Sequence, residues 1–243
     1  LRPGALVVLE STSPPGTTRN MAEYIIEKRP DLSLREDDDN AIFIAHCPER
    51  VLPGQIMEEM ENNDRVIGGL TPKGTELARD LYATFCTAEL LTTDATTAEM
   101  AKLTENSFRD VNIAFANELS LISDRLGIDI WELIELANHH PRVNILKPGP
   151  GVGGHCIAVD PWFIVSTAPE TANLIRTARE VNDSKPIWVL QKIKAAAERF
   201  GDSPTIALLG LAFKPNIDDL RESPALEIAK KVAESFPNAE IHA

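Results

Sequence analysis

The residues best suited to chemistry lie in a glycine-rich segment, Gly149-Pro150-Gly151-Val152-Gly153-Gly154-His155-Cys156. Its spacing formally satisfies GxGxxG, but a dinucleotide fingerprint needs a strand before it and a helix after it. This segment follows predicted helices and ends in His-Cys. We interpret it as a loop whose glycines let a ligand approach the backbone and whose Cys156 is a candidate nucleophile. The alternative is a structural turn around a buried, inert cysteine.

A second group of polar side chains is spaced at helical intervals. Lys102, Asn106 and Arg109 are four and three residues apart and therefore share one face of a helix. Such a stripe is usually solvated surface. The same predicted helix becomes apolar on nearly every side between residues 111 and 122, and a Lys held near a core can have its pKa tuned for proton transfer. Both interpretations stay open on the residues alone.

Two polar loops follow predicted buried strands. Glu10-Ser11-Thr12 follows one strand, and Cys47-Pro48-Glu49-Arg50 follows another. In open α/β sheets, ligands bind outside the carboxyl ends of the strands, so both loops are well placed for binding. The alternative is ordinary turn chemistry. We expect no metal site, because neither Cys47 nor Cys86 has a ligand neighbour at zinc spacing.

Length and composition bound the class of protein. The chain has 243 residues, of which 43% are hydrophobic and 25% charged, as in an ordinary soluble protein of about two domains. A net charge of −13 argues against nucleic-acid binding, which usually needs a basic face. No apolar run reaches the ~20 residues of a membrane helix. Three widely spaced cysteines favour a reducing compartment, and we expect a cytoplasmic protein.

The ends of the sequence indicate a piece of a longer polypeptide. The chain begins with Leu1 rather than Met and enters a predicted strand directly, without a secretory leader. It ends inside another predicted strand, at residues 239–243.

The pattern of elements predicts an α/β protein with a helical middle. Strands are expected at 5–9, 41–45, 65–68, 89–92 and 205–209, with helices at 21–28 and 71–85 between the early ones, which favours a mostly parallel sheet. Thr96-Thr97-Ala98-Glu99 fits a capping box, and the helix it starts has no breaker before Gly127. We expect that helix to be buried all round, joining two domains or forming a dimer seam. Further helices are expected at 128–138, at 171–200 with a kink near Pro186, and from Ser223.

Five motifs, in this order, resemble the four-electron nucleotide-sugar dehydrogenases of the UDP-glucose/GDP-mannose dehydrogenase family, over almost the whole chain. They are residues 10–18, Pro48-Glu49, Glu99-Met100-Ala101-Lys102 with Asn106, residues 151–156, and residues 210–215 with 221–224. The resemblance implies two Rossmann-like parallel-sheet half-domains joined by a long central helix and a helical waist. It divides the chain into 1–93 (part of the NAD-binding domain), 94–200 (central helical region) and 201–243 (start of the UDP-sugar-binding domain).

The resemblance also implies a substrate. The UDP-glucose branch has a second glutamate four residues after the first, where this chain has Pro53. Residues 47–51, 106–112 and 140–144 look instead like the branch that oxidises UDP-N-acetyl-D-mannosamine at C6, with NAD, to the uronate used for surface polysaccharides. The alternatives are UDP-N-acetylglucosamine, UDP-glucose or GDP-mannose as substrate, or a non-catalytic dimerisation module that keeps the family sequence.

Roles for individual residues follow from the same resemblance. Cys156 is expected to add to the intermediate aldehyde as a thiolate, giving a thiohemiacetal and then a thioester. Lys102 and Asn106 would stabilise oxyanions, Asp160 and Thr12 would orient the hydrolytic water, and Glu49 is a further candidate base. Thr12 and Arg221 match NAD-contacting positions. Substrate-contacting positions are Arg50, Val51, Lys102, Asn106, Arg109, His140, Arg142, Gly153, Phe213 and Lys214.

The resemblance also implies a homodimer through the central helix, with no nucleic-acid or membrane partner. The family begins with a strand, a GxGxxG turn and an acidic residue for the ribose, and no such segment stands in this sequence before residues 5–9. We therefore expect the 243 residues alone to lack dehydrogenase turnover.

Overall fold

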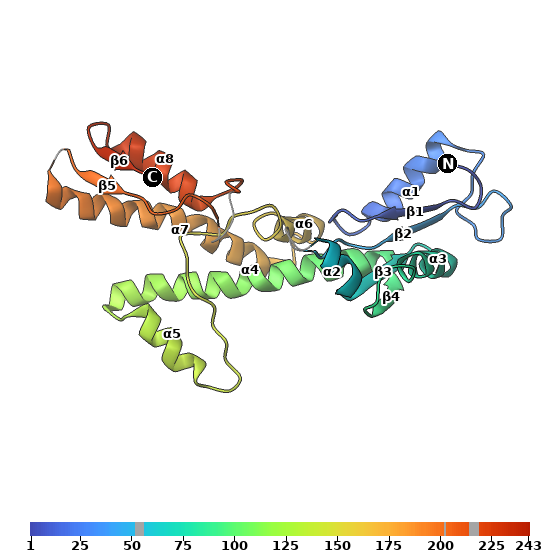
Figure 1. Cartoon of the computed structure of the whole chain (residues 1–243), viewed down its shortest axis with the longest axis horizontal. Helices are drawn as coiled ribbons and strands as arrows, with labels where there is room; N and C mark the ends of the chain where they lie inside the picture. The colour runs from blue at the N-terminus through green and yellow to red at the C-terminus, as the bar shows by residue number, and fades with distance from the viewer. Residues whose placement is uncertain (52–55, 202, 214–218) are drawn as a thin grey trace. The chain divides into compact units, whose positions relative to one another are not determined.

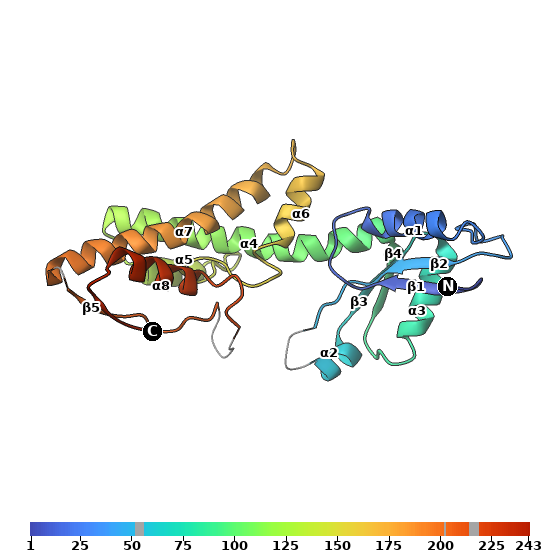
Figure 2. The same ribbon diagram turned by 90° about the horizontal axis from the view of Figure 1, so that it is seen from above.

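The computed structural model describes residues 1–51, 56–201, 203–213 and 219–243. The chain divides into two compact units, and in the first, Leu1–Glu105, short apolar runs form a four-stranded sheet. The strands β1 (Leu6–Leu9), β2 (Phe43–His46), β3 (Arg65–Gly69) and β4 (Leu90–Asp94) lie in that order across the sheet (Figure 2). The β1–β2 and β3–β4 pairs are parallel, and β2–β3 is antiparallel. The predicted strands and the mostly parallel sheet are confirmed.

Both faces of this sheet are covered by a helix, and β1 and most of β2 are accordingly apolar. Successive side chains of a strand point to opposite faces, so Ile44 packs with the helix α1 (Thr17–Lys28) and its neighbour Ala45 packs with α3 (Pro72–Tyr82). The cluster on the α1 face contains Ala22, Leu32, Ile42 and Ile44, and the cluster on the α3 face contains Ala45, Cys47, Ile67, Ala78 and Tyr82.

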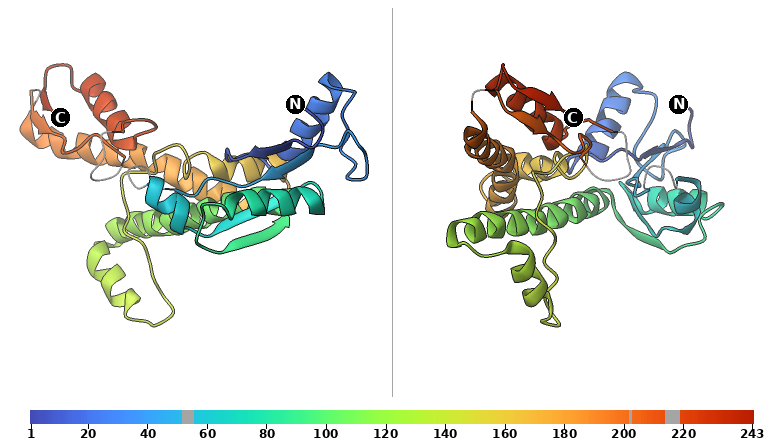
Figure 3. Two further views of the ribbon diagram at one scale, coloured as in Figure 1. Left: turned by 45° about the vertical axis from the view of Figure 1, so that its right-hand side comes forward. Right: turned by 60° about the vertical axis from the view of Figure 1, so that its left-hand side comes forward.

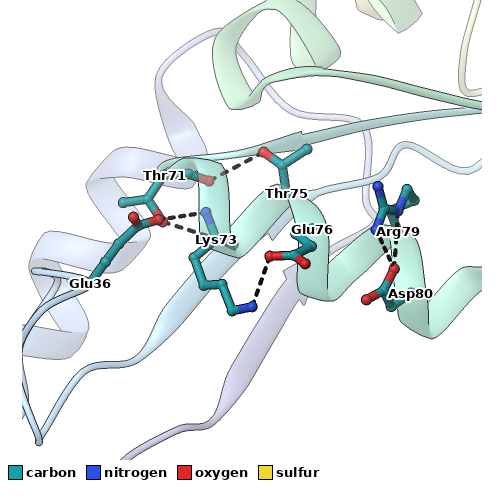
Figure 4. A network of polar contacts seen from close by, with 8 residues as sticks. Glu36, Thr71, Lys73, Thr75, Glu76, Arg79 and Asp80 are labelled. Atoms are coloured by element: carbon teal, nitrogen blue, oxygen red, sulfur yellow. Dashed lines mark hydrogen bonds and ion pairs between the residues drawn. The ribbon is translucent and has the colours of Figure 1, made fainter.

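The outer surface of α3 carries charged side chains that form local pairs (Figure 4). Thr71 caps the helix by accepting the Gly74 N–H at 3.2 Å, and Lys73 pairs with Glu76 at 2.8 Å. Exposed pairs of this kind contribute ~1 kcal/mol or less each. We interpret the charged residues of this surface as a solvated face of α3.

The long central helix α4 (Ala95–Leu126) begins differently from the prediction. Its first turn is capped by Asp94, whose carboxylate accepts the Thr97 N–H at 3.0 Å and the Thr97 hydroxyl at 2.6 Å. The predicted capping box is therefore wrong, because Asp94 ends β4 at the point where the helix starts. The predicted end is confirmed: α4 stops before Gly127, which has a positive φ of 69° as helix-terminating glycines commonly do. None of the helices in the described ranges is long and apolar enough to cross a membrane.

The second unit, Asn106–Ala243, is mainly helical (Figure 1). It contains the rest of α4, then α5 (Ile130–Asn138), α6 (Asp160–Thr167), α7 (Asn173–Ala197) with Pro186 inside it, and the short 3₁₀ helix η1 (Glu198–Phe200). The strands β5 (Thr205–Ala207) and β6 (Glu240–His242) pair in parallel, and α8 (Pro224–Ser235) packs against α7. The helix α6 is an element for which the sequence analysis named no helix.

The side of α4 that packs on α7 is polar. Asp110 is fully buried and accepts hydrogen bonds from Arg179 at 2.6 Å and from Asn182 at 2.8 Å. The apolar residues Phe108, Phe115 and Ile122 are instead 71%, 55% and 45% exposed. The expectation that α4 is buried all round between residues 111 and 122 is therefore wrong for a single copy of this chain, because Phe115 and Ile122 are exposed while polar Asn117 and Ser120 are buried.

A lysine is buried in the same layer. Lys185 on α7 is 3% exposed; its ammonium donates to the Ser120 hydroxyl and lies 4.1 Å from the centre of the Trp188 ring. Burial lowers the pKa of Lys185 to about 8, and the charge of Asp124 partly opposes this shift.

This pKa predicts how the stability of the second unit depends on pH. Lysine in an unfolded chain has a pKa near 10.4, so between pH 8 and 10 the unfolded state binds more protons than the folded state. The free energy of unfolding should then rise with pH, by at most about 1.4 kcal/mol per pH unit. Urea denaturation of Lys185→Met should lack this rise. Lys192→Met, an exposed change on the same helix, should keep it; a rise that persists in Lys185→Met would contradict the assignment.

Candidate functional site

The proposed nucleophile lies in the loop between α5 and α6, the yellow segment in Figure 3. Cys156 is exposed, whereas Cys47 and Cys86 are buried. The Cys156 carbonyl accepts the N–H groups of Val159 at 3.1 Å and Asp160 at 2.8 Å, which places the cysteine in the turn that leads into α6. The alternative of a buried, inert cysteine is wrong.

The glycines of this loop are required by packing. A Cβ on Gly153 would lie 2.4 Å from the Glu222 carbonyl oxygen and 2.7 Å from the Phe213 Cβ. Gly154 has a φ of 86° and lies against the Phe213 ring. The structure thus brings together two of the predicted substrate-contacting residues, Gly153 and Phe213. Glu222, the other residue that packs against Gly153, has a positive φ of 50°, which is uncommon for a residue with a side chain.

Two predicted catalytic residues are joined directly. The Asn106 side-chain amide donates to Asp160 Oδ2 at 2.5 Å, and Asp160 is 4% exposed. Asp160 is also the first residue of α6, where a negative charge is favoured by the helix dipole. Cys156, Asp160 and Asn106 therefore form one connected set in the second unit, in which a buried carboxylate with a fixed orientation stands four residues after an exposed thiol.

The loop that carries Cys156 is also anchored at its start. Asn117 Oδ1 accepts the Gly149 N–H at 2.9 Å, and Asn117 Nδ2 donates to Asn182 Oδ1 at 2.8 Å. Asn182 in turn bonds Asp110. Sequence reasoning missed this network, although Asp110 and Asn117 are polar residues seven apart within or beside an apolar run, which is a signal for a polar buried stripe.

In the first unit, Lys102 lines a cavity of about 440 Å³ together with Arg50 and Glu105. The Arg50 guanidinium pairs with the Glu105 carboxylate and donates to the Asp64 carbonyl at 3.0 Å. Val51, half-buried, follows Arg50. Cationic side chains at a cavity can bind a phosphate or a sugar oxygen, and here Arg50 and Lys102 share the cavity with the carboxylates of Asp64 and Glu105.

The two polar strand-end loops lie side by side, because β1 and β2 are parallel and in register. The Glu49 N–H donates to the Glu10 carbonyl at 3.1 Å. Glu49 Oε1 accepts the N–H groups of Arg50 at 2.7 Å and Val51 at 3.0 Å, so Glu49 also forms its own turn. Thr12 is half-buried in the loop that precedes α1.

Other predicted residues are not assembled around Cys156 by any contact in the described ranges. Arg109, His140 and Arg142 are exposed, and the His140 Nδ1 accepts the Arg142 N–H at 3.3 Å. Arg221 is bound to Asp219, with Nη2 2.6 Å from Oδ2, and this guanidinium holds the pKa of Asp219 well below its usual range. Lys214 lies outside the described residues. Within the described ranges, no three His, Cys, Asp or Glu residues are grouped so that they could hold a metal ion.

Comparison with known proteins gives matches along most of the chain. Models of the UDP-glucose/GDP-mannose dehydrogenase family match residues 1–86 (NAD binding domain), 96–184 (central domain) and 207–243 (UDP binding domain). The UDP-N-acetyl-D-mannosamine dehydrogenase of Escherichia coli K12 is 61% identical over 243 residues, which is 96% of this chain and 58% of that protein. The NDP-N-acetyl-D-galactosaminuronic acid dehydrogenase of Ralstonia nicotianae is 61% identical over 96% of this chain and 56% of that protein.

Among solved structures, the UDP-D-ManNAc dehydrogenase of Pyrococcus horikoshii is similar with a TM-score of 0.89 and 45% identity. It covers 99% of this chain, and the match covers 57% of that structure. The chain therefore spans somewhat more than half the length of the relatives it matches.

The packing around Gly153 predicts opposite outcomes for one substitution at two places in the same loop. Gly153→Ala should destabilise the second unit by ~1–3 kcal/mol, as overpacking does, because its Cβ must displace backbone and ring atoms. Gly149→Ala should unfold like the wild type, since its Cβ would meet only the Gly151 carbonyl oxygen at 3.8 Å. Thermal unfolding checks both, and equal midpoints for the two variants would contradict the packing role.

Proposed function

Because this chain belongs to the UDP-glucose/GDP-mannose dehydrogenase family, we propose that the whole protein is an NAD-dependent UDP-N-acetyl-D-mannosamine 6-dehydrogenase. It would oxidise the C6 alcohol to a carboxylate in two steps, giving the uronate for surface polysaccharides. The observation that carries the proposal is the exposed Cys156 followed by the buried, Asn106-bound carboxylate of Asp160. That arrangement suits a covalent thioester and its hydrolysis.

The thiol explains how one site performs two oxidations. The C6 alcohol first loses a proton and a hydride and becomes an aldehyde, which is a poor hydride donor. The Cys156 thiolate adds to the aldehyde carbon and gives a thiohemiacetal, whose loss of a second hydride leaves a thioester. Water then displaces the thiol and releases the carboxylate. NAD, when bound, supplies the acceptor for each hydride.

Each of the other candidate residues has a proposed task in these steps. Asp160, held by Asn106, orients the water that attacks the thioester, and the Asn106 amide also donates to the oxyanion. The Lys102 ammonium stabilises the oxyanion and handles the alcohol proton. Glu49 binds its own loop through Oε1, so a proton would be accepted at Oε2. Thr12 fits a cofactor because it lies at the carboxyl end of β1, where parallel sheets bind dinucleotides.

The substrate assignment depends on the sugar and phosphate contacts. Arg50 and Lys102 share a cavity, which supports an anionic or polar ligand there, and Gly153 and Phe213 pack together beside Cys156. We retain the proposed contacts to substrate or NAD for five further residues: Arg109, His140, Arg142, Lys214 and Arg221. Since the Ralstonia relative is as similar as the Escherichia one, a UDP-linked N-acetylgalactosamine is the second candidate substrate.

Domain limits and location are part of the same proposal. The matched ranges fall within the divisions 1–93, 94–200 and 201–243, which supports them. All three cysteines are free thiols, which supports a cytoplasmic enzyme.

We also propose that the protein is a homodimer through α4. Phe108, Phe115 and Ile122 are seven residues apart, all exposed, while the opposite side of α4 is buried and polar. A line of large apolar residues at heptad spacing is the pattern of a helix that packs on another helix. A second copy of α4 is the proposed partner because the stripe would then be self-complementary.

The activity is tested on the full-length protein with a panel of UDP-N-acetylmannosamine, UDP-N-acetylgalactosamine, UDP-N-acetylglucosamine and UDP-glucose. The wild type should form two NADH per molecule of UDP-N-acetylmannosamine. Cys156→Ser should form at most one NADH per sugar and turn over roughly 100-fold more slowly or worse, because the thiohemiacetal is lost.

Cys86→Ser, which changes a buried cysteine, is the matched control and should keep two NADH per sugar. The 243 residues alone should give no steady NADH. Uronate formation at wild-type rate by Cys156→Ser would overturn the mechanism, and no NADH from any sugar would favour the non-catalytic module.

The dimer is tested by light scattering of full-length variants. Phe115→Glu places a charge in the middle of the stripe and should halve the molar mass. Tyr24→Glu, an equally exposed aromatic position on α1 at 61% exposure, should leave the mass unchanged. A wild type with the mass of one chain would refute this interface.

A further inference from the structure

Glu99 makes the most extensive buried contact between distant segments of the first unit. It is 1% exposed, and its Oε1 accepts the Thr18 N–H at 2.7 Å and the Thr18 hydroxyl at 2.6 Å. Its Oε2 accepts the Gly16 N–H at 2.6 Å. Both carboxylate oxygens are thus engaged by donors that lie more than eighty residues away in sequence.

These hydrogen bonds cap the N-terminus of α1. That helix begins after Gly16, which has a φ of 92° and provides no side-chain cap, so its first N–H groups need acceptors from elsewhere. Glu99 on α4 accepts the N–H groups of Gly16 and Thr18, while the Thr17 N–H donates to the Pro14 carbonyl at 3.1 Å. A carboxylate is favoured at this positive end of the α1 dipole. Glu99 is available to cap α1 because Asp94 already caps the start of α4.

We propose that Glu99 is a positioning residue that fixes the loop carrying Thr12 against the part of α4 carrying Lys102. This inference rests on the proposed function. Gly16 stands four residues after Thr12, and Glu99 stands one helical turn before Lys102. The carboxylate therefore joins the two segments that bear a proposed cofactor or water contact and the proposed oxyanion-stabilising ammonium.

The loop between Thr12 and Gly16 is stiff enough to transmit this constraint. The Ser13 hydroxyl donates to the Ser11 carbonyl at 2.8 Å, and the Thr17 hydroxyl donates to the Pro14 carbonyl at 2.7 Å. Pro14 and Pro15 restrict the backbone between them. A shift of Gly16 away from α4 would consequently move Thr12 as well, rather than being absorbed by a flexible segment.

The test uses Glu99→Gln in the full-length protein. The amide keeps the shape of the carboxylate but replaces one acceptor with an N–H donor that faces other donors. We expect kcat to fall about 10- to 100-fold, since small misplacements of catalytic groups have effects of this size. The KM for the UDP-sugar should change less than about threefold, because apart from Lys102 the residues proposed to contact the sugar lie outside the two segments that Glu99 joins. Thr18→Val should show a smaller fall in kcat than Glu99→Gln. Thr18→Ser, which keeps the hydroxyl that donates to Glu99, should have the wild-type kcat.

Thr71→Ala is the matched control, because it removes a helix cap from α3 in the same unit (Figure 4). It should lower the melting temperature and leave kcat unchanged. If Thr71→Ala loses as much kcat as Glu99→Gln, or if Glu99→Gln keeps the wild-type kcat, the positioning role is overturned.

Hydrogen exchange gives a readout that does not depend on turnover. Amide protection in the peptide 11–19 should fall in Glu99→Gln, while the peptide 71–82 exchanges as in the wild type. If the wild type is inactive on every sugar, the proposed function fails, and exchange alone decides whether Glu99 holds the loop. Unchanged exchange in residues 11–19 would refute that contact whatever the activity.

Discussion

Two carboxylates buried along α4 determine what can pack against this helix. A buried charge is strongly unfavourable unless it is paired or hydrogen-bonded. In the first unit Glu99 meets this requirement through the N–H groups and hydroxyl at the start of α1. In the second unit Asp110 meets it through Arg179 and Asn182. Each pairing selects one neighbouring element and one register, because another placement of α1 or α7 would leave the charge without a partner.

The candidate chemistry lies beside these pairings. Lys102 is one turn beyond Glu99, and Asn106 is one turn before Asp110 on the same helix. The polar chain that starts at Asp110 continues through Asn182 and Asn117 to Gly149, at the start of the loop that carries Cys156. The loop is held further along by contact of Gly153 with Phe213 and Glu222. The exposed thiol of Cys156 thus follows two fixed points of its loop, Gly149 and Gly153, and precedes a third, the Asn106-bound Asp160.

The polar inward side of α4 has a consequence for its outward side. A helix in a water-soluble protein usually buries its apolar stripe, whereas here Phe108 and Phe115 are exposed and the buried positions include Asp110 and Asn117. Packing of the exposed stripe against α4 of a second copy would bury these apolar residues, as is usual for a helix. The same helix would then support the Cys156 loop on one side and join two copies on the other.

The sequence by itself determined most of the elements, because strands and helices follow from local periodicity, caps and breakers. The strand at β1, the helix α5 and the stop of α4 at Gly127 were predictable from neighbouring residues, whereas α6 was not. Residue type and spacing singled out Cys156 and Asn106 as candidates, and the family resemblance added Asp160. Assigning them to one family needed the five motifs in order.

Only the tertiary structure decided which donors each buried acid meets. Glu99 fits a local capping box by spacing, yet its partners are Gly16 and Thr18, because Asp94 satisfies the helix start first. Likewise, an apolar run indicates that a helix is buried but not on which side, so the exposed stripe of α4 could not be foreseen. Pairings between residues 65 to 83 positions apart depend on how whole elements pack, and no local pattern encodes that.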